Sequence, residues 1–148
     1  MKRPILLEGL FSAVLAIGCG DPLSVEELAG TYQLTAMDAR SLPQLLSATV
    51  ECDEWVQVGN LTLQPSGEFM LVVQGELDCT RGGGQVQMIG WEYPGSYSVV
   101  GRTLQFVSPL FPSGELHFTG TVELLNTRIL VTDLDLHSSN ATDLEFRR

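Results

Sequence analysis

The fold of this chain is decided by the stretch GNLTLQPSGEFMLVVQGELD, residues 59–78. Apolar residues occupy alternate positions at 61–63 and again at 69–77, with mostly polar residues between them. Such a period of two is typical of β-strands that bury one face. Pro65-Ser66-Gly67 separates the two segments, and these are residue types that favour tight turns. The stretch therefore predicts a β-hairpin with one apolar face.

Segments with the same alternation lie on both sides of this hairpin. They are residues 31–37, 49–58, 86–89, 97–100, 103–106, 116–124, 128–136 and 144–146. The apolar parity changes within 128–136, which predicts a β-bulge near Thr132. Eight to ten evenly spaced strands predict an all-β, antiparallel up-and-down meander that closes into a barrel, because closure removes exposed strand edges. A two-sheet β-sandwich is the alternative.

The amino terminus resembles an export signal. Met1-Lys2-Arg3 is basic, residues 9–17 are small or apolar, and Gly18-Cys19 follows. This arrangement is typical of a secretory signal peptide over 1–18, and it is shorter than the roughly 20 apolar residues of a spanning helix. Ordinary secretion with an incidental cysteine is one interpretation of the segment.

The residues at the end of that segment resemble a more specific motif. Ala16-Ile17-Gly18-Cys19 is similar to the lipobox of bacterial lipoproteins. The resemblance implies cleavage before Cys19 and acylation of its thiol, and two or more acyl chains give stable membrane anchoring. Gly20 follows the cysteine instead of the aspartate that favours inner-membrane retention. We therefore expect a cell-envelope protein, anchored in the outer membrane, on its periplasmic or surface side, rather than in the inner membrane.

The remaining chain is long enough for one domain. Ser24 and Glu27 have the spacing of a capping box and predict a short helix. We expect a signal peptide at 1–18, a lipidated tether with this helix at 19–27, and one β-domain at 28–148.

The chain is strongly acidic, with a formal net charge of −10 from 8 basic and 18 acidic residues. Its single lysine, Lys2, lies in the predicted signal peptide. This balance repels phosphate backbones and therefore excludes nucleic acid as a partner. We expect the membrane to be reached through the lipid anchor.

Two cysteines remain beyond the anchor, Cys52 and Cys79. In an oxidising compartment an even pair predicts a disulfide, and neither cysteine has further ligands at metal-binding spacing. Two free thiols are the alternative.

The domain resembles bacterial lipocalin-like lipoproteins. The resemblance is carried by the turns and aromatic residues at 28–34, 41–43, 59–69, 95–97 and 144–147. It implies a lipocalin-like β-barrel over residues 28–148. Gly30-Thr31-Tyr32 stands where lipocalins have Gly-x-Trp, which implies that Tyr32 closes one barrel end, with Arg128 or Arg147 stacked on it.

Aromatic residues give the main indication of a ligand. Candidates for lining the barrel and contacting a small apolar ligand are Tyr32, Trp55, Phe69, Tyr97, Phe106 and Phe118. Barrels of about eight strands either hold one such ligand or fill their interior with side chains. Trp91 and Tyr93 are predicted between strands and are candidates for contact with a protein partner, since exposed aromatic residues are costly without a use.

Catalysis has little support in the sequence. His117 and His137 have no companions at metal-ligand spacing, and His117 is predicted to face outward from its strand. Asp133 and Asp135 share one strand face without forming a calcium loop. We expect neither an enzyme nor a cofactor or metal site.

Two functions therefore remain open. One is a non-catalytic, lipid-anchored envelope lipoprotein that binds a small apolar ligand inside its barrel. The other is a structural or assembly lipoprotein whose filled barrel acts through loop contacts to an envelope protein.

Overall fold

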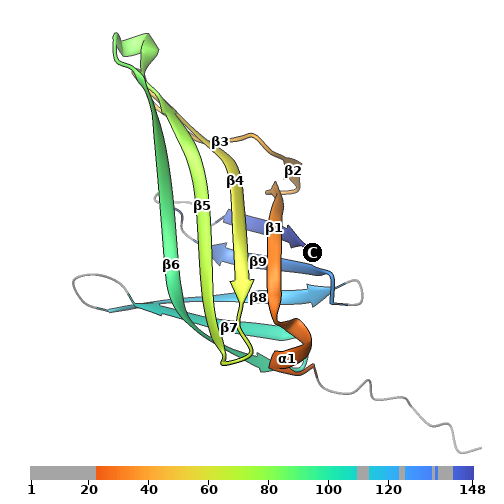
Figure 1. The fold of residues 1–148 in the computed structure, drawn as a ribbon. Helices are drawn as coiled ribbons and strands as arrows, with labels where there is room; N and C mark the ends of the chain where they lie inside the picture. The colour runs from red at the N-terminus through yellow and green to blue at the C-terminus, as the bar shows by residue number, and fades with distance from the viewer. Residues whose placement is uncertain (1–22, 110–113, 124–125, 135, 137–141) are drawn as a thin grey trace, which may run out of the picture.

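The computed structural model describes residues 23–109, 114–123, 126–134, 136 and 142–148, which contain one short helix and ten strands (Figure 1). The elements are α1 (Val25–Leu28), β1 (Gly30–Met37), β2 (Arg40–Ser41), β3 (Gln44–Ala48), β4 (Asp53–Leu63), β5 (Glu68–Asp78), the 3-10 turn η1 (Thr80–Gly82), β6 (Val86–Val100), β7 (Thr103–Pro109), β8 (Glu115–Glu123), β9 (Arg128–Leu134) and β10 (Thr142–Arg147).

The strands form one antiparallel sheet that closes on itself. Its order is β2-β1-β10-β9-β8-β7-β6-β5-β4-β3, and β1 also pairs with β4, with Gly30 opposite Leu63 and Gln33 opposite Asn60. Eight strands therefore complete the barrel, while β2 and β3 are additional. The closed meander confirms the predicted barrel, and the sandwich alternative is wrong.

The short helix α1 begins at the predicted capping box. Ser24 Oγ accepts a hydrogen bond from the backbone N–H of Glu27, and the Glu27 carboxylate accepts one from the backbone N–H of Ser24. These reciprocal bonds satisfy two of the donors that a helix start leaves open. Leu28 is fully buried, so the helix packs across one end of the barrel (Figure 1).

Three strands of the barrel extend well beyond it on the side away from α1. We call this extension the arm; it consists of β3 with residues 53–57 of β4, 74–78 of β5 and 86–94 of β6 (Figure 1). Its inner face continues the barrel wall and carries Val56 and Gly75. Its outer face carries Trp55 opposite Glu76.

The arm differs from the sequence prediction in three places. Residues 49–52 form a turn between β3 and β4 instead of the start of a strand, and β3 (Gln44–Ala48) is a strand that was not predicted. Residues 86–100 form one continuous strand where two strands with a connection were predicted. Between Ile89 and Val99, larger apolar residues, Gly95 apart, alternate with polar or small ones, and Gly90 and Pro94 occupy positions of the second set.

The predicted bulge in β9 is confirmed. Thr142 pairs with Leu134, but Leu144 pairs with Val131, so β9 contributes one residue more than β10 between these pairs. The extra residue shifts the apolar parity, which keeps Val131 and Leu134 both buried in the core.

Candidate interaction surface

Aromatic rings pack against one another at one level of the barrel interior. The ring centroids of Phe69 and Phe106 are 4.9 Å apart, those of Phe106 and Phe118 4.8 Å, and those of Phe69 and Phe118 5.7 Å. The three side chains are buried, and Tyr97 lies beside Phe106 at 6.2 Å. Such ring contacts stabilise a core beyond the area they bury. Four candidate ligand residues thus contact one another in the core.

The Tyr97 hydroxyl extends from this cluster toward the end that α1 covers. It donates a hydrogen bond to the Gln64 carbonyl at 2.9 Å, and the Val25 carbonyl of α1 lies 3.4 Å away. Burial raises the pKa of Tyr97 to about 12, so the hydroxyl remains a donor at any physiological pH.

Tyr32 closes the same end, as the lipocalin resemblance implies. Its hydroxyl donates to the Leu28 carbonyl at 2.9 Å, and burial raises its pKa above 10.0. The arginine over its ring is Arg148, 5.1 Å from the centroid, so the expected stacking of Arg128 or Arg147 is wrong. Those two arginines instead bind Glu145 through its two oxygens, each at 2.7 Å.

Trp55 is separated from the other candidate ligand residues. It lies on the outer face of the arm, opposite Glu76 of β5 and Leu45 of β3, and it is half-buried. The structure therefore brings five of the six candidates into the barrel and leaves Trp55 on the outside of the arm.

Trp91 and Tyr93 lie within β6 and not in a connection. Trp91 is opposite Val73 and Tyr93 is opposite Leu71, and both side chains are half-buried against the core. Trp91 lies over Gly75, where a Cβ would be 3.5 Å from its ring and 1.9 Å from the Trp55 carbonyl oxygen. Glycine at position 75 thus allows the close approach of β4 and the seating of Trp91.

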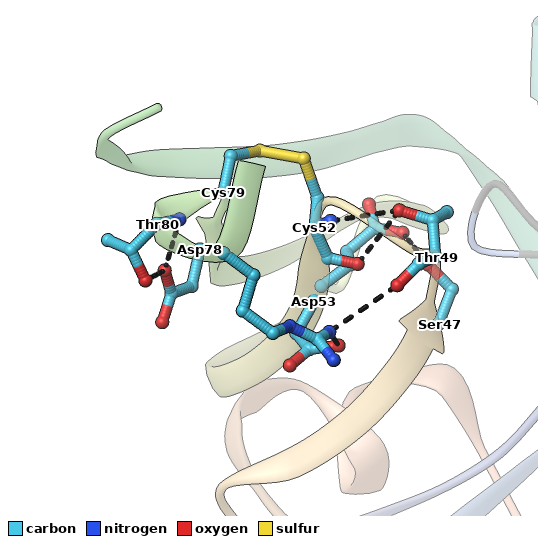
Figure 2. Close-up of a disulfide and its surroundings, with 9 residues drawn as sticks. Ser47, Thr49, Cys52, Asp53, Asp78, Cys79 and Thr80 are labelled. Atoms are coloured by element: carbon cyan, nitrogen blue, oxygen red, sulfur yellow. Dashed lines mark hydrogen bonds and ion pairs between the residues drawn. A yellow bond between two sulfur atoms is a disulfide. The ribbon is translucent and has the colours of Figure 1, made fainter. Parts of the chain in front are cut away.

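The tip of the arm is joined by the predicted disulfide between Cys52 and Cys79, which links the start of β4 to the end of β5 (Figure 2). The hydroxyl of Thr49 accepts a hydrogen bond from the Cys52 N–H at 2.9 Å. The backbone N–H of Thr49 donates to the Cys52 carbonyl at 2.7 Å. Arg81 forms an ion pair with Asp53 and its guanidinium also reaches the Thr49 carbonyl. These contacts join the tip of the arm to β4 and β5.

The arm is acidic. Residues 44–57 and 74–94 contain one basic residue, Arg81, and six acidic residues: Glu51, Asp53, Glu54, Glu76, Asp78 and Glu92. Hydrogen bonds from the Thr80 hydroxyl and N–H, at 2.7 and 2.9 Å, hold the pKa of Asp78 below its ordinary value of 3.8. The arm therefore keeps a net negative charge at neutral pH.

The outer face of the arm and the barrel wall next to it also expose apolar side chains. Of the large exposed hydrophobic residues in the described part of the chain, five lie on this face: Leu45, Val58, Met70, Val86 and Met88. Met88 is the most exposed of the five at 69%, and Val86 is exposed at 49%. Exposed apolar side chains that lie together on one face are typical of an interaction site.

Within the described ranges, no three His, Cys, Asp or Glu side chains converge to hold a metal ion. His117 faces outward, as predicted, and its Nε2 lies 3.2 Å from Glu115. His137 and Asp135 lie outside the described residues, as does the side chain of Asp133. Among the described helices, none has the length and apolar character needed to cross a bilayer.

The sequence did not reveal that the arm exists, although it contained one signal for it. Larger apolar residues recur at every second position from Ile89 to Val99, Gly95 apart, and this pattern indicates one strand longer than either of the two predicted. The predicted lipid-attachment residue, Cys19, lies outside the described residues. Comparisons of the sequence with known protein families and with curated proteins find no match.

Proposed function

We propose that this chain is a non-catalytic, lipid-anchored lipoprotein of the bacterial cell envelope, whose barrel is a rigid base and whose arm contacts a protein partner. The membrane anchor in this proposal is Cys19, and outer-membrane sorting follows from Gly20. Support for the anchor comes from the lipobox-like Ala16-Ile17-Gly18-Cys19 after a short apolar segment.

The observation that favours a protein partner over a ligand is the division of apolar side chains between barrel and arm. Inside the barrel, the rings of Phe69, Phe106 and Phe118 contact one another, so these side chains take up space that a ligand would need. On the arm, Val86 and Met88 are exposed to solvent. Burial of apolar area drives association, so binding at the arm would bring a partner the largest gain in free energy.

Uptake of a small apolar molecule inside the barrel is the second candidate. It is favoured by the lining of the barrel, because the buried side chains in the described ranges are apolar apart from Ser108 and Thr142. A fluorescent fatty acid separates the two functions: we expect no saturable increase in fluorescence on addition of the protein. A saturable increase that unlabelled fatty acid reverses would replace the first proposal with the second.

The anchor is tested by Cys19→Ala in the full chain expressed in a bacterial host. We expect the wild-type protein to incorporate labelled palmitate and to fractionate with membranes, because two or three acyl chains hold it there. The variant should be unlabelled and soluble after export, while Gly20→Ala, which keeps the thiol, should still be labelled. Membrane fractionation of the unlabelled variant would show that something other than a lipid anchors the chain.

A further inference from the structure

The arm has one long free edge, along residues 86–92 of β6. β7 pairs with β6 only from Ser96 to Val100, and on the side away from β5 no described strand pairs with residues 86–92. On the other side, eleven consecutive residue pairs join β6 to β5 without a register shift. The edge is therefore regular in geometry, and among the described strands it pairs with β5 alone.

Two hydrogen bonds show which backbone groups of β6 face that edge. The N–H of Tyr97 donates to the Gly67 carbonyl, on the β5 side, and the Pro94 carbonyl accepts from Ser108 Oγ of β7 at 2.7 Å. Successive residues of an antiparallel strand point their N–H and C=O groups to opposite sides. The backbone groups of Val86, Met88, Gly90 and Glu92 therefore point to the free edge.

This edge lacks the features that usually prevent strand pairing. Edges are commonly protected by lysine, by proline, by bulges or by being short. The opposite edge of the arm has two of these protections, because β3 contains five residues and a register shift between Leu45 and Ser47. In contrast, 86–92 contains no basic residue or proline, and Pro94 lies where Ser108 already contacts its carbonyl.

The side chains around the edge select the chemistry of an added strand. On the outer face, Glu92 follows Met88 along β6, and Glu76 lies opposite Met88 on β5. On the inner face, the neighbours are the half-buried Ile89 and Trp91. An added strand would place alternate side chains beside these two sets, so the outer-facing ones meet carboxylates and the inner-facing ones meet apolar surface.

We propose that residues 86–92 of β6 bind an extended segment of another polypeptide by strand addition, and that this segment alternates basic with apolar residues. The proposal rests on the proposed function, since it specifies how the arm contacts its partner. Main-chain hydrogen bonds at Val86, Met88, Gly90 and Glu92 supply affinity, and the carboxylates of Glu76 and Glu92 supply selectivity for basic residues.

A second copy of the chain is a poorer occupant of this edge. β6 contains no basic residue that could meet Glu92 of another copy. Each arm also has six acidic residues against one basic residue, so two arms side by side repel one another.

The test is a titration of the full exported chain, uniformly labelled with 15N, with a synthetic peptide of alternating valine and lysine. We expect amide hydrogen exchange to slow at Met88, Gly90 and Glu92, whose N–H groups face the free edge. Exchange at Ile89 and Trp91 should change little, because their N–H groups already pair with β5. The control peptide has the same sequence with N-methyl groups on alternate residues, which preserves its charge and removes the backbone donors along one of its edges.

Two variants separate the backbone and charge contributions. Met88→Pro removes one edge N–H and should weaken binding by about tenfold, whereas Met88→Ala, which keeps that N–H, should weaken it less. Glu92→Gln should reduce affinity for the valine–lysine peptide and leave the weak binding of a valine–glutamine peptide unchanged. If Met88→Pro unfolds the arm, the N-methylated peptide still tests the backbone contribution and Glu92→Gln still tests the charge contribution.

Three outcomes would overturn the proposal: equal binding of the N-methylated peptide, protection of amides elsewhere in the chain, or dimers that protect the same amides without peptide. The last outcome would assign the edge to a second copy. Failure here, with Cys19→Ala behaving as expected and no fatty acid bound, would remove strand addition and leave the proposed function standing.

Discussion

The guanidinium of Arg148 lies 5.1 Å from the centre of the Tyr32 ring and closes the end of the barrel that α1 covers. Arg148 also donates to the Ala29 carbonyl at 3.0 Å, so the last residue of the sequence is bonded to the chain just before β1. The first and last described segments of the domain are thus in direct contact at this end of the barrel.

This closure predicts that Tyr32→Phe and Arg148→Ala both destabilise the domain. Removing the Tyr32 hydroxyl leaves the buried Leu28 carbonyl without its 2.9 Å donor, which we expect to cost about 1–2 kcal/mol. Loss of the Arg148 stacking and hydrogen bonds should cost about 1 kcal/mol. Urea denaturation provides the measurement, with Arg40→Ala, at an exposed position on β2, as the control. Equal midpoints for Arg148→Ala and Arg40→Ala would contradict this role.

Reduction of the Cys52–Cys79 disulfide is predicted to lower the melting temperature. The bond closes a loop with a sequence separation of 27, for which chain entropy gives about 3–4 kcal/mol. Because the bond lies at the tip of the arm, we expect amides near the tip to lose exchange protection before those of the barrel. Melting curves with and without reductant measure the first effect. An unchanged melt, with both thiols titrated as free, would contradict it.

Gly95→Ala is predicted to destabilise the barrel where β6 passes from the arm into the wall. A Cβ at this position would lie 2.1 Å from the Val107 carbonyl oxygen and 2.7 Å from the Phe69 ring. We expect a loss of about 2–3 kcal/mol, since the neighbouring backbone must shift. The matched control is Gly90→Ala on the same strand, where the nearest atom is 3.4 Å away. Equal stability of the two variants in urea would show that β6 adapts without cost.

Glu145 is predicted to make the stability of the domain depend on acid pH. Its hydrogen bond with Arg128, followed by that with Arg147, holds its pKa below the ordinary value of 4.5. Because the folded-state pKa is the lower one, the stabilisation is fully present above pH 4.5 and is lost as the pH falls through the folded value.

The measurement is urea denaturation of the wild type and Glu145→Gln between pH 7 and pH 3. We expect the variant to be less stable at pH 7 and to lose less stability on acidification than the wild type. Glu115→Gln, at an exposed position, is the control and should follow the wild-type profile. A wild-type acid slope in Glu145→Gln would assign the pH dependence to other groups.

Most of the barrel was predictable because its signals are local. The alternation on either side of Pro65-Ser66-Gly67 defines β4 and β5, and the parity change in 128–136 locates the β9 bulge. The capping box at Ser24 and Glu27 needs only four residues. Each of these features depends on the chemistry of neighbouring residues in the chain.

The arm and the site were not predictable in the same way. Pro94 and Gly95 suggest a turn, yet both fit a strand here: the missing N–H of Pro94 is on the side away from β5, and Gly95 leaves room for the Val107 carbonyl. Which arginine reaches Tyr32 depends on the register of β10 against β1 and β9, which no local pattern encodes. The long free edge follows from β7 leaving β6 at Ser96, a consequence of barrel closure.

The placement of α1 and the arm at opposite ends of the barrel gives the molecule a direction (Figure 1). If an acylated Cys19 sits in the bilayer, the five residues from Gly20 to Ser24 reach at most about 17 Å, which keeps the capped end close to the headgroups. The ten residues of β6 beyond Ser96 then carry Met88 and Val86 farther from the lipid, about 30 Å along the strand. The barrel axis would then point away from the bilayer, and the free edge of β6 would lie in the aqueous space at some distance from the membrane surface.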